Sequence, residues 1–151
     1  MSAAPSLRQL LAAERHGMLA TLSARRAGWP FASAVPYGVD ASGEPVLVLS
    51  ELAEHTRNLR ADPRASLLVQ DSAAAEDPQA GARVTLLGTL SVTGDADARQ
   101  RYVERHPQAD EYLAMGDFHV WRLNVTEARY VGGFGDMGWL EGSRLRQALS
   151  E

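Results

Sequence analysis

The sequence predicts a mostly β, α+β fold: a small barrel of about six strands with short helices at the chain ends and connections. Three observations support this fold class. Short β-capable runs alternate with turn signals along the chain. Two of these runs contain a residue that bends a sheet, Pro36 or Gly88. The helical patterns are short, and no internal repeat or domain boundary interrupts residues 1–151, which are expected to form one domain.

The N-terminal part predicts one helix and one strand. Pro5 and Ser6 begin a helix, which Gly17 is expected to end. Met18–Ser23 then has the length and residue types of a strand, and a turn follows it. The apolar stripe of the helix consists of Leu7, Leu10 and Leu11.

The second and third predicted strands form a hairpin. Pro30–Val39 is a strand interrupted by Pro36, which lacks an N–H for a sheet and therefore favours an edge position. Asp40–Gly43 is a strong turn signal, and the apolar run Pro45–Leu49 forms the returning strand.

The stretch 50–69 combines a short amphipathic helix with a cluster of polar side chains. Helical spacing places Leu52 and Leu59 toward the core and leaves His55, Thr56 and Arg57 near one another on the exposed side. Such a helix start, reached directly from a strand, can bind a phosphate through N–H groups, hydroxyls and a guanidinium. An ordinary exposed connection with a capping serine explains the same residues, and this alternative stays open. The polar residues are Ser50, His55, Thr56, Arg57 and Asn58.

The remaining elements follow from local signals. Asp62-Pro63 ends the helix before a strand at Ala65–Val69. The later elements are expected in this order: a mobile loop at Ser72–Gly81, a strand at Arg83–Thr93 bulged at Gly88, a helix from Asp95 to His106, a short helix at Asp110–Met115, strands at Phe118–Val125 and Tyr130–Phe134, and a weakly helical tail at Gly142–Ser150.

Composition excludes several classes of chemistry. The 151 residues contain no cysteine, and all fifteen basic residues are arginine, so thiolate catalysis and a lysine Schiff base are absent. A net charge of −4 indicates no general affinity for nucleic acid or an anionic membrane. No apolar run is long enough to span a bilayer, and the N-terminus lacks a signal-peptide pattern. A cytoplasmic protein is the expectation.

Two further sequence patterns do not indicate a functional site. Gly133–Gly138 fits G-x-G-x-x-G, but it lacks the following helix of a dinucleotide fold and is interpreted as a glycine-rich loop. The four histidines show no metal-ligand spacing, so no metal site and no catalytic residue is predicted. His16 and His106 are expected at helix ends. His119 is expected to face solvent or a ligand opening.

Five segments, taken in order, resemble the FMN-binding split-barrel superfamily, which contains the pyridoxamine 5'-phosphate oxidases and their haem-utilisation relatives. The last segment is similar to the haem-utilisation branch in particular. The segments are GMLATLS, PFASAVPYGVD, SELAEHTRNLRADPRASLLV, RVTLLG and YLAMGDFHVWRLNVTEARYVGGFG, between Gly17 and Gly135.

The resemblance implies a six-stranded split barrel that forms a homodimer, with FMN at the subunit interface. It implies that Ser33, Val35, Pro36 and Tyr37 lie along the flavin ring. It places Ser50, His55, Thr56, Arg57 and Asn58 around the phosphate, and Arg83 near the ring.

Two functions follow from the resemblance. The first is an FMN-dependent oxidoreductase acting on an unidentified small molecule, in which the flavin carries the chemistry. The alternative is a haem-binding module without flavin turnover, with His119 or His55 as a possible axial ligand. The oxidases hold their substrate phosphate with an Arg-x-His element, whereas this chain has Met137-Gly138-Trp139, so oxidation of pyridoxamine 5'-phosphate is not expected.

Overall fold

The computed structural model describes residues 5–74, 76–133 and 136–151. Its helices are α1 (Leu7–Ala13), α2 (Glu54–Ala61), α3 (Ala96–Arg105), α4 (Ala109–Ala114) and α5 (Gly142–Ser150), with one 3-10 turn at Ser72–Ala74. Its strands are β1 (His16–Leu22), β2 (Pro30–Pro36), β3 (Gly38–Val39), β4 (Pro45–Ser50), β5 (Arg64–Gln70), β6 (Arg83–Val92), β7 (Phe118–Gly133) and β8 (Asp136–Glu141).

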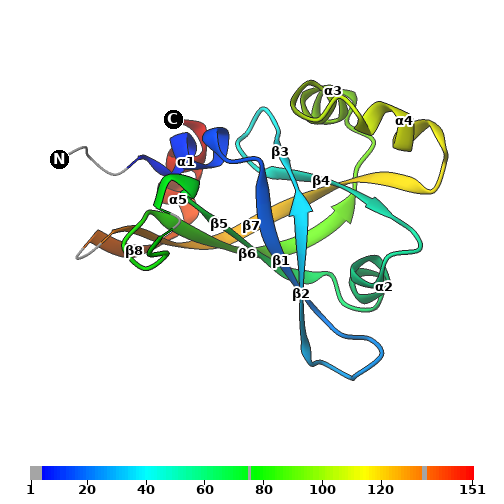
Figure 1. Ribbon diagram of the computed structural model, residues 1–151, viewed down its shortest axis with the longest axis horizontal. Coiled ribbons are helices and arrows are strands. Elements are labelled where there is room, and N and C mark those ends of the chain that lie inside the picture. Colours follow the sequence, from blue (N-terminus) through cyan, green and yellow to red (C-terminus); the bar gives the residue numbers. More distant parts are fainter. Residues whose placement is uncertain (1–4, 75, 134–135) are drawn as a thin grey trace.

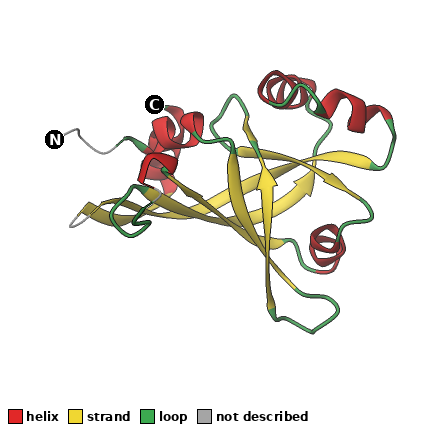
Figure 2. Ribbon diagram, in the orientation of Figure 1, coloured by secondary structure: helices red, strands yellow, loops and turns green. Residues whose placement is uncertain are grey.

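The strands form one curled antiparallel sheet in the order β2-β1-β5-β6-β7-β4-β3, and β8 pairs with β7. Short helices lie around this sheet: α1 and α5 together, α3 and α4 together, and α2 apart from both (Figures 1 and 2). The predicted mostly β, α+β class is therefore confirmed. No described helix is long and apolar enough to cross a membrane.

The sheet has eight strands, so the prediction of six was wrong. The predicted strand Pro30–Val39 divides at Tyr37, whose backbone N–H donates to Arg15 O, 3.1 Å away, and so leaves the ladder. The predicted glycine-rich loop contributes β8, which pairs with β7 from Asp136 onward. Phe134 and Gly135 lie outside the described residues.

The inner side of the sheet holds the main core. Leucines of α1 and α5 pack there against alternate residues of β1, β5 and β6, including Leu19, Leu67 and Leu86. Ser6 caps α1 as expected, because its side chain accepts a hydrogen bond from the N–H of Gln9. Gly17 does not end α1; it lies within β1, so that prediction was wrong. A Cβ at Gly17 would meet Leu68 O at 2.9 Å, which explains why β1 can approach β5 so closely.

The β6–β7 pairing shifts register between Leu87 and Gly88, where Thr126 of β7 is the extra residue, so a bulge lies at the position that the sequence predicts. A Cβ at Gly88 would lie 2.1 Å from Asn124 O, so the two strands need glycine at this position. The bulge lets the two halves of β7 pair with different neighbours, β4 in the first half and β8 in the second.

A second apolar cluster lies under α3 and α4, against β4 and the first half of β7. Asp95 caps α3 as expected, accepting hydrogen bonds from the N–H groups of Asp97 and Ala98. Asp95 also pairs with Arg122 at 2.6 Å, and Arg122 reaches the buried Asp40 at 2.7 Å. These ion pairs fix α3 to the outer side of the sheet.

The rest of the outer side carries no helix among the described elements, and we call it the open face. One continuous row of side chains crosses it, because Met18 pairs with Ala34 and Leu68, and the register continues through Thr85 to Arg129. Met18 and Trp139 are each about half exposed. The apolar members of the open face are Met18, Ala20, Ala34, Leu68, Leu87, Val131, Met137 and Trp139, and the polar members are His16, Ser66, Gln70, Arg83, Thr85, Glu127 and Arg129.

Candidate functional site

The predicted phosphate segment differs from expectation at its start. Helix α2 begins at Glu54, and its N-cap residue, Ala53, provides no side-chain hydrogen bond. Ser50 therefore does not cap the helix; its hydroxyl oxygen instead accepts a hydrogen bond from Leu52 N–H at 3.2 Å. Leu52 precedes the helix and is 75% exposed, so its predicted core position was wrong, whereas Leu59 is buried as expected.

Two of the polar residues in this segment are structural. Thr56 is 1% exposed, and its hydroxyl donates to Ser50 O at 2.6 Å. Asn58 is fully buried; its amide donates to Thr21 Oγ1 at 3.0 Å and accepts from Ala24 N–H at 2.9 Å. The expectation that Thr56 lies on the exposed side was wrong, because its hydroxyl and the amide of Asn58 join α2 to the strands.

The other members of the segment remain accessible but are surrounded by carboxylates. The Arg57 side chain is 65% exposed and lies 3.8 Å from Glu54. Glu51 pairs with Arg60 and lies 3.4 Å from His119 Nε2. His55 is half-buried, and burial lowers the pKa of its imidazole. The two exposed guanidinium groups, those of Arg57 and Arg60, therefore each lie next to a carboxylate.

Arg60 also lies over the ring of Trp121, 5.0 Å from the centroid. The Trp121 indole nitrogen is buried without a hydrogen-bond partner, which distinguishes it from the other buried side-chain nitrogens and oxygens of the described residues. Helix α2 therefore closes this end of the inner core and exposes few donors that a ligand could use.

The four residues predicted to lie along the flavin ring do not share one face: they lie on both sides of β2 and in the core. Ser33 and Val35 face inward with Leu19 and Gly17 as their strand partners, and Val35 is buried. Pro36 is exposed, opposite His16. Tyr37 is fully buried in the main core.

Tyr37 is held by several contacts from the N-terminal helix and α3. Its hydroxyl donates to Leu11 O at 2.7 Å, and burial raises the pKa of the phenol above its ordinary range. The Arg105 guanidinium lies 5.2 Å from the ring centroid and donates to carbonyls at the end of α1. The Tyr37 side chain is therefore part of the scaffold.

Arg83 lies on the open face, far along the sheet from α2. Its Nη1 donates to the carbonyl oxygens of Pro78, Gln79 and Gly81 at 3.0–3.3 Å, which holds the guanidinium at the start of β6. Within one chain, Arg83 therefore does not join the segment 50–58. The assignment of the ten residues to FMN stays a prediction.

The four histidines occupy different environments. His106 ends α3 as expected, is 3% exposed, and its Nε2 donates to Tyr37 O at 2.8 Å. Burial lowers the pKa of this imidazole. His16 is the first residue of β1 and not a helix end, so its prediction was wrong. Its imidazole has no hydrogen bond or ion pair within the described part of the chain.

His16 lines a cavity of about 350 Å³ at the edge of the open face. Met18 and Leu68 form an apolar wall of this cavity, and Glu14, Gln70 and Ser72 add polar groups; the Ser72 hydroxyl donates to the Glu14 carboxylate at 3.1 Å. Sequence reasoning missed this site because it assigned His16 to a helix end. The alternation His16-Gly17-Met18, with a small residue between two side chains of one face, was the available signal.

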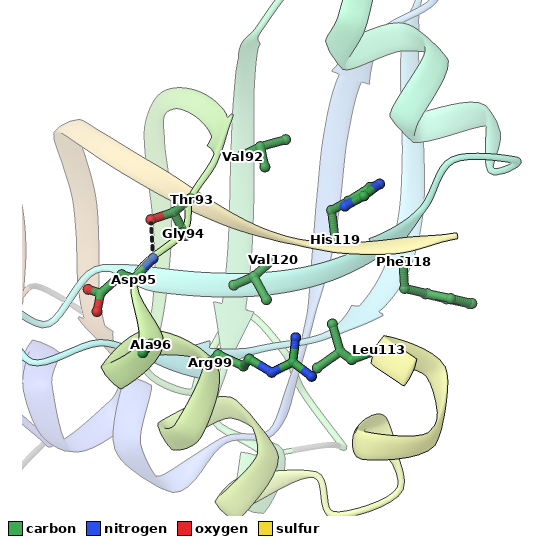
Figure 3. A pocket seen from close by; sticks show the side chains of 10 residues that line it. All are labelled: Val92, Thr93, Gly94, Asp95, Ala96, Arg99, Leu113, Phe118, His119 and Val120. Carbon is green, nitrogen blue, oxygen red and sulfur yellow. Dashed lines mark hydrogen bonds between the residues drawn. The ribbon is translucent and has the colours of Figure 1, made fainter. Parts of the chain in front are cut away.

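A second cavity, of about 250 Å³, lies where β7 meets α3 and α4 (Figure 3). His119 lines its rim, but its side chain and that of Val120 lie on opposite sides of β7. Leu113 and Phe118 add apolar side chains to the lining, and Arg99 adds a guanidinium. His119 faces solvent, as expected, with Glu51 as its neighbour.

Comparisons with known proteins agree with this architecture. The family model described as "CREG, beta-barrel" matches residues 1–145. The Arabidopsis thaliana protein named non-canonical heme oxygenase HOZ, chloroplastic, is 36% identical over 138 residues, which cover 88% of this chain and 41% of that protein. The heme binding protein from Mycobacterium smegmatis is 39% identical, with a TM-score of 0.83, over 95% of this chain and 57% of that one.

A Clostridium acetobutylicum protein of the pyridoxinephosphate oxidase family shares the fold, with a TM-score of 0.65 and 14% identity over 87% of this chain and 89% of that one. The resemblance to the FMN-binding split barrels and their haem-related branch is thereby confirmed. The chain spans 41% of the Arabidopsis relative and 57% of the mycobacterial one.

Proposed function

Because the chain belongs to the CREG beta-barrel family, we propose that it is a haem-binding protein of the split-barrel class. One relative, 36% identical, is named a heme oxygenase, and another, 39% identical, is named a heme binding protein. The sequence similarity to each extends over most of this chain. A bound haem would supply the iron chemistry, while the protein supplies binding, orientation and an axial ligand.

One structural observation supports this proposal above others. The open face offers exposed apolar side chains, the His16 imidazole, which has no hydrogen bond or ion pair among the described residues, and the cations Arg83 and Arg129. A porphyrin needs these features: apolar contact for the macrocycle, a nitrogen ligand for the iron, and positive charges for the propionates. The described residues therefore fit haem better than they fit a flavin phosphate.

We also propose that two copies form a two-fold homodimer through the open face, with the ligand between them. The exposed Met18, Met137 and Trp139 would be buried in such a contact. Glu127 lies opposite Glu141 in the β7–β8 pair, an unfavourable arrangement that the arginines of a second copy would relieve. A two-fold interface repeats each contact and gives two equivalent sites. Light scattering should give twice the chain mass; a monomer that retains haem affinity would contradict this.

FMN binding, with oxidoreductase activity, is the second candidate. It is supported by the accessible groups of Ser50, His55 and Arg57 near the start of α2. If this segment binds the phosphate, FMN should bind more tightly than riboflavin. Arg57→Ala, which removes the exposed guanidinium and leaves the structural Thr56 in place, should weaken FMN binding by about 1.5–3 kcal/mol. Oxidation of pyridoxamine 5'-phosphate is not expected in either case. A single domain and a cytoplasmic location remain predictions from the sequence.

Titration of the purified chain with haem and, separately, with FMN distinguishes the two candidates. Haem binding should produce a saturable Soret band at one haem per chain. If the chain binds FMN and not haem, flavin fluorescence should be quenched on FMN addition, and no Soret band should develop on haem addition. Saturable FMN binding without a Soret change would overturn the haem proposal.

A further inference from the structure

The axial ligand of a haem must be a side chain with a free lone pair, reachable by a flat macrocycle. An imidazole whose ring nitrogens are both unengaged meets the first condition, and a position on an uncovered apolar surface meets the second. The four histidines of this chain can therefore be compared on the same two criteria.

Three of the histidines fail at least one criterion. His106 is buried, and its Nε2 already donates to Tyr37 O. His119 lies 3.4 Å from Glu51, within a group of charges that includes Arg60. His55 is half-buried on α2, where the neighbouring side chains of Thr56 and Asn58 join the helix to the strands.

His16 meets both criteria. Its imidazole has no hydrogen bond or ion pair among the described residues, and its side chain lines the cavity of about 350 Å³ on the open face. Met18, two residues along β1 on the same side, and Leu68 across the strand pair form the apolar wall beside it. Gly17, between them, lets β1 lie close to β5 and so determines the position of His16.

We infer that His16 is the axial ligand of the haem iron, an assignment that rests on the proposed haem function. Arg83 is then placed to receive a propionate. Gln70 of β5 pairs with Arg83 of β6 and lines the same cavity as His16 of β1. His16 and Arg83 therefore lie on opposite sides of β5, two strand spacings or about 10 Å apart. The three loop carbonyls at Nη1 leave the other guanidinium nitrogens of Arg83 available to a carboxylate.

The test is haem titration of the full chain, comparing wild type, His16→Ala and the control His119→Ala, with resonance Raman spectra of the ferrous forms. Wild type should show an iron–histidine stretching band that His16→Ala lacks. The haem dissociation constant of His16→Ala should rise by more than about tenfold, since loss of groups that only orient a metal ligand already costs 10- to 100-fold. Free imidazole should restore the band in His16→Ala.

The outcomes separate the two levels of the proposal. A wild-type chain without a Soret band would overturn haem binding itself. Normal haem binding with an unchanged iron–histidine band in His16→Ala would overturn the ligand assignment alone. Loss of the band in His119→Ala would move the assignment to His119. Unchanged urea unfolding of each variant would show that the comparison concerns folded protein, which is expected because the His16 side chain is exposed and that of His119 is 42% exposed.

Discussion

The segment 50–58 and the open face are both candidate ligand regions, but their side chains are used differently. In the segment, the polar groups of Thr56 and Asn58 are buried and hydrogen-bonded to neighbouring strands. On the open face, His16 has no hydrogen bond or ion pair among the described residues, its ring contacts that of His106 at a centroid distance of 6.2 Å, and apolar side chains remain exposed. A polar pattern in a sequence can therefore serve the scaffold, whereas an unsatisfied group on an uncovered surface is available to a ligand.

The largest effect on stability is expected from Asn58→Ala. The substitution leaves the buried Thr21 hydroxyl and the N–H of Ala24 without their partner, which should lower the free energy of unfolding by about 2–3 kcal/mol. Urea unfolding measures this change. Arg57→Ala, one residue away but exposed, is the control and should change stability by less than about 0.5 kcal/mol. Equal effects of the two substitutions would show that Asn58 is not structural.

Gly17→Ala should have the next largest effect. A Cβ there would meet Leu67 Cδ1 and Leu68 O at 2.9 Å, so β1 and β5 must move apart, at a cost of about 1–3 kcal/mol. Haem affinity should fall as well, because His16 moves with β1. Gly138→Ala in β8 is the matched control, since nothing lies within 4 Å of its Cβ position. A stable Gly17→Ala chain with weakened haem binding would show that the spacing of β1 and β5 serves only the ligand.

A smaller effect should appear as a pH dependence of stability. Burial lowers the pKa of His106 in the folded chain, so the unfolded chain binds the proton first as the pH falls. Stability should be highest above the ordinary histidine pKa of about 6.5 and should decrease as the pH falls toward the folded pKa. His106→Gln keeps a donor for Tyr37 O and should reduce this slope in urea unfolding.

The smallest effect on stability is expected from Met18→Gln on the open face. Because Met18 is half exposed, the free energy of unfolding of the single chain should change by less than about 0.5 kcal/mol. Self-association and haem affinity should nevertheless weaken, since apolar contact area is lost. Sedimentation at several concentrations checks the first effect. An unchanged association constant would remove Met18 from the proposed interface.

Several features of the fold were determined by local sequence. Ser6 and Asp95 cap helices because their side chains accept hydrogen bonds from N–H groups two or three residues further on. The bulge at Gly88 follows from a glycine within a long strand, and Pro63 ends α2 next to Asp62. The family resemblance was also readable, because it depends on the order of such segments. These features need few contacts from distant residues.

Tertiary structure decided which side chains are free. Asn58 looked available until Thr21 and Ala24, more than thirty residues away, were seen to bind its amide. His16 looked like a helix end until β1 placed it beside Leu68 on an uncovered surface. The number of strands likewise depended on the hydrogen bond that the backbone N–H of Tyr37 donates to Arg15 O. Residues distant in sequence decide whether each polar group is hydrogen-bonded within the fold, and local periodicity carries no information about those residues.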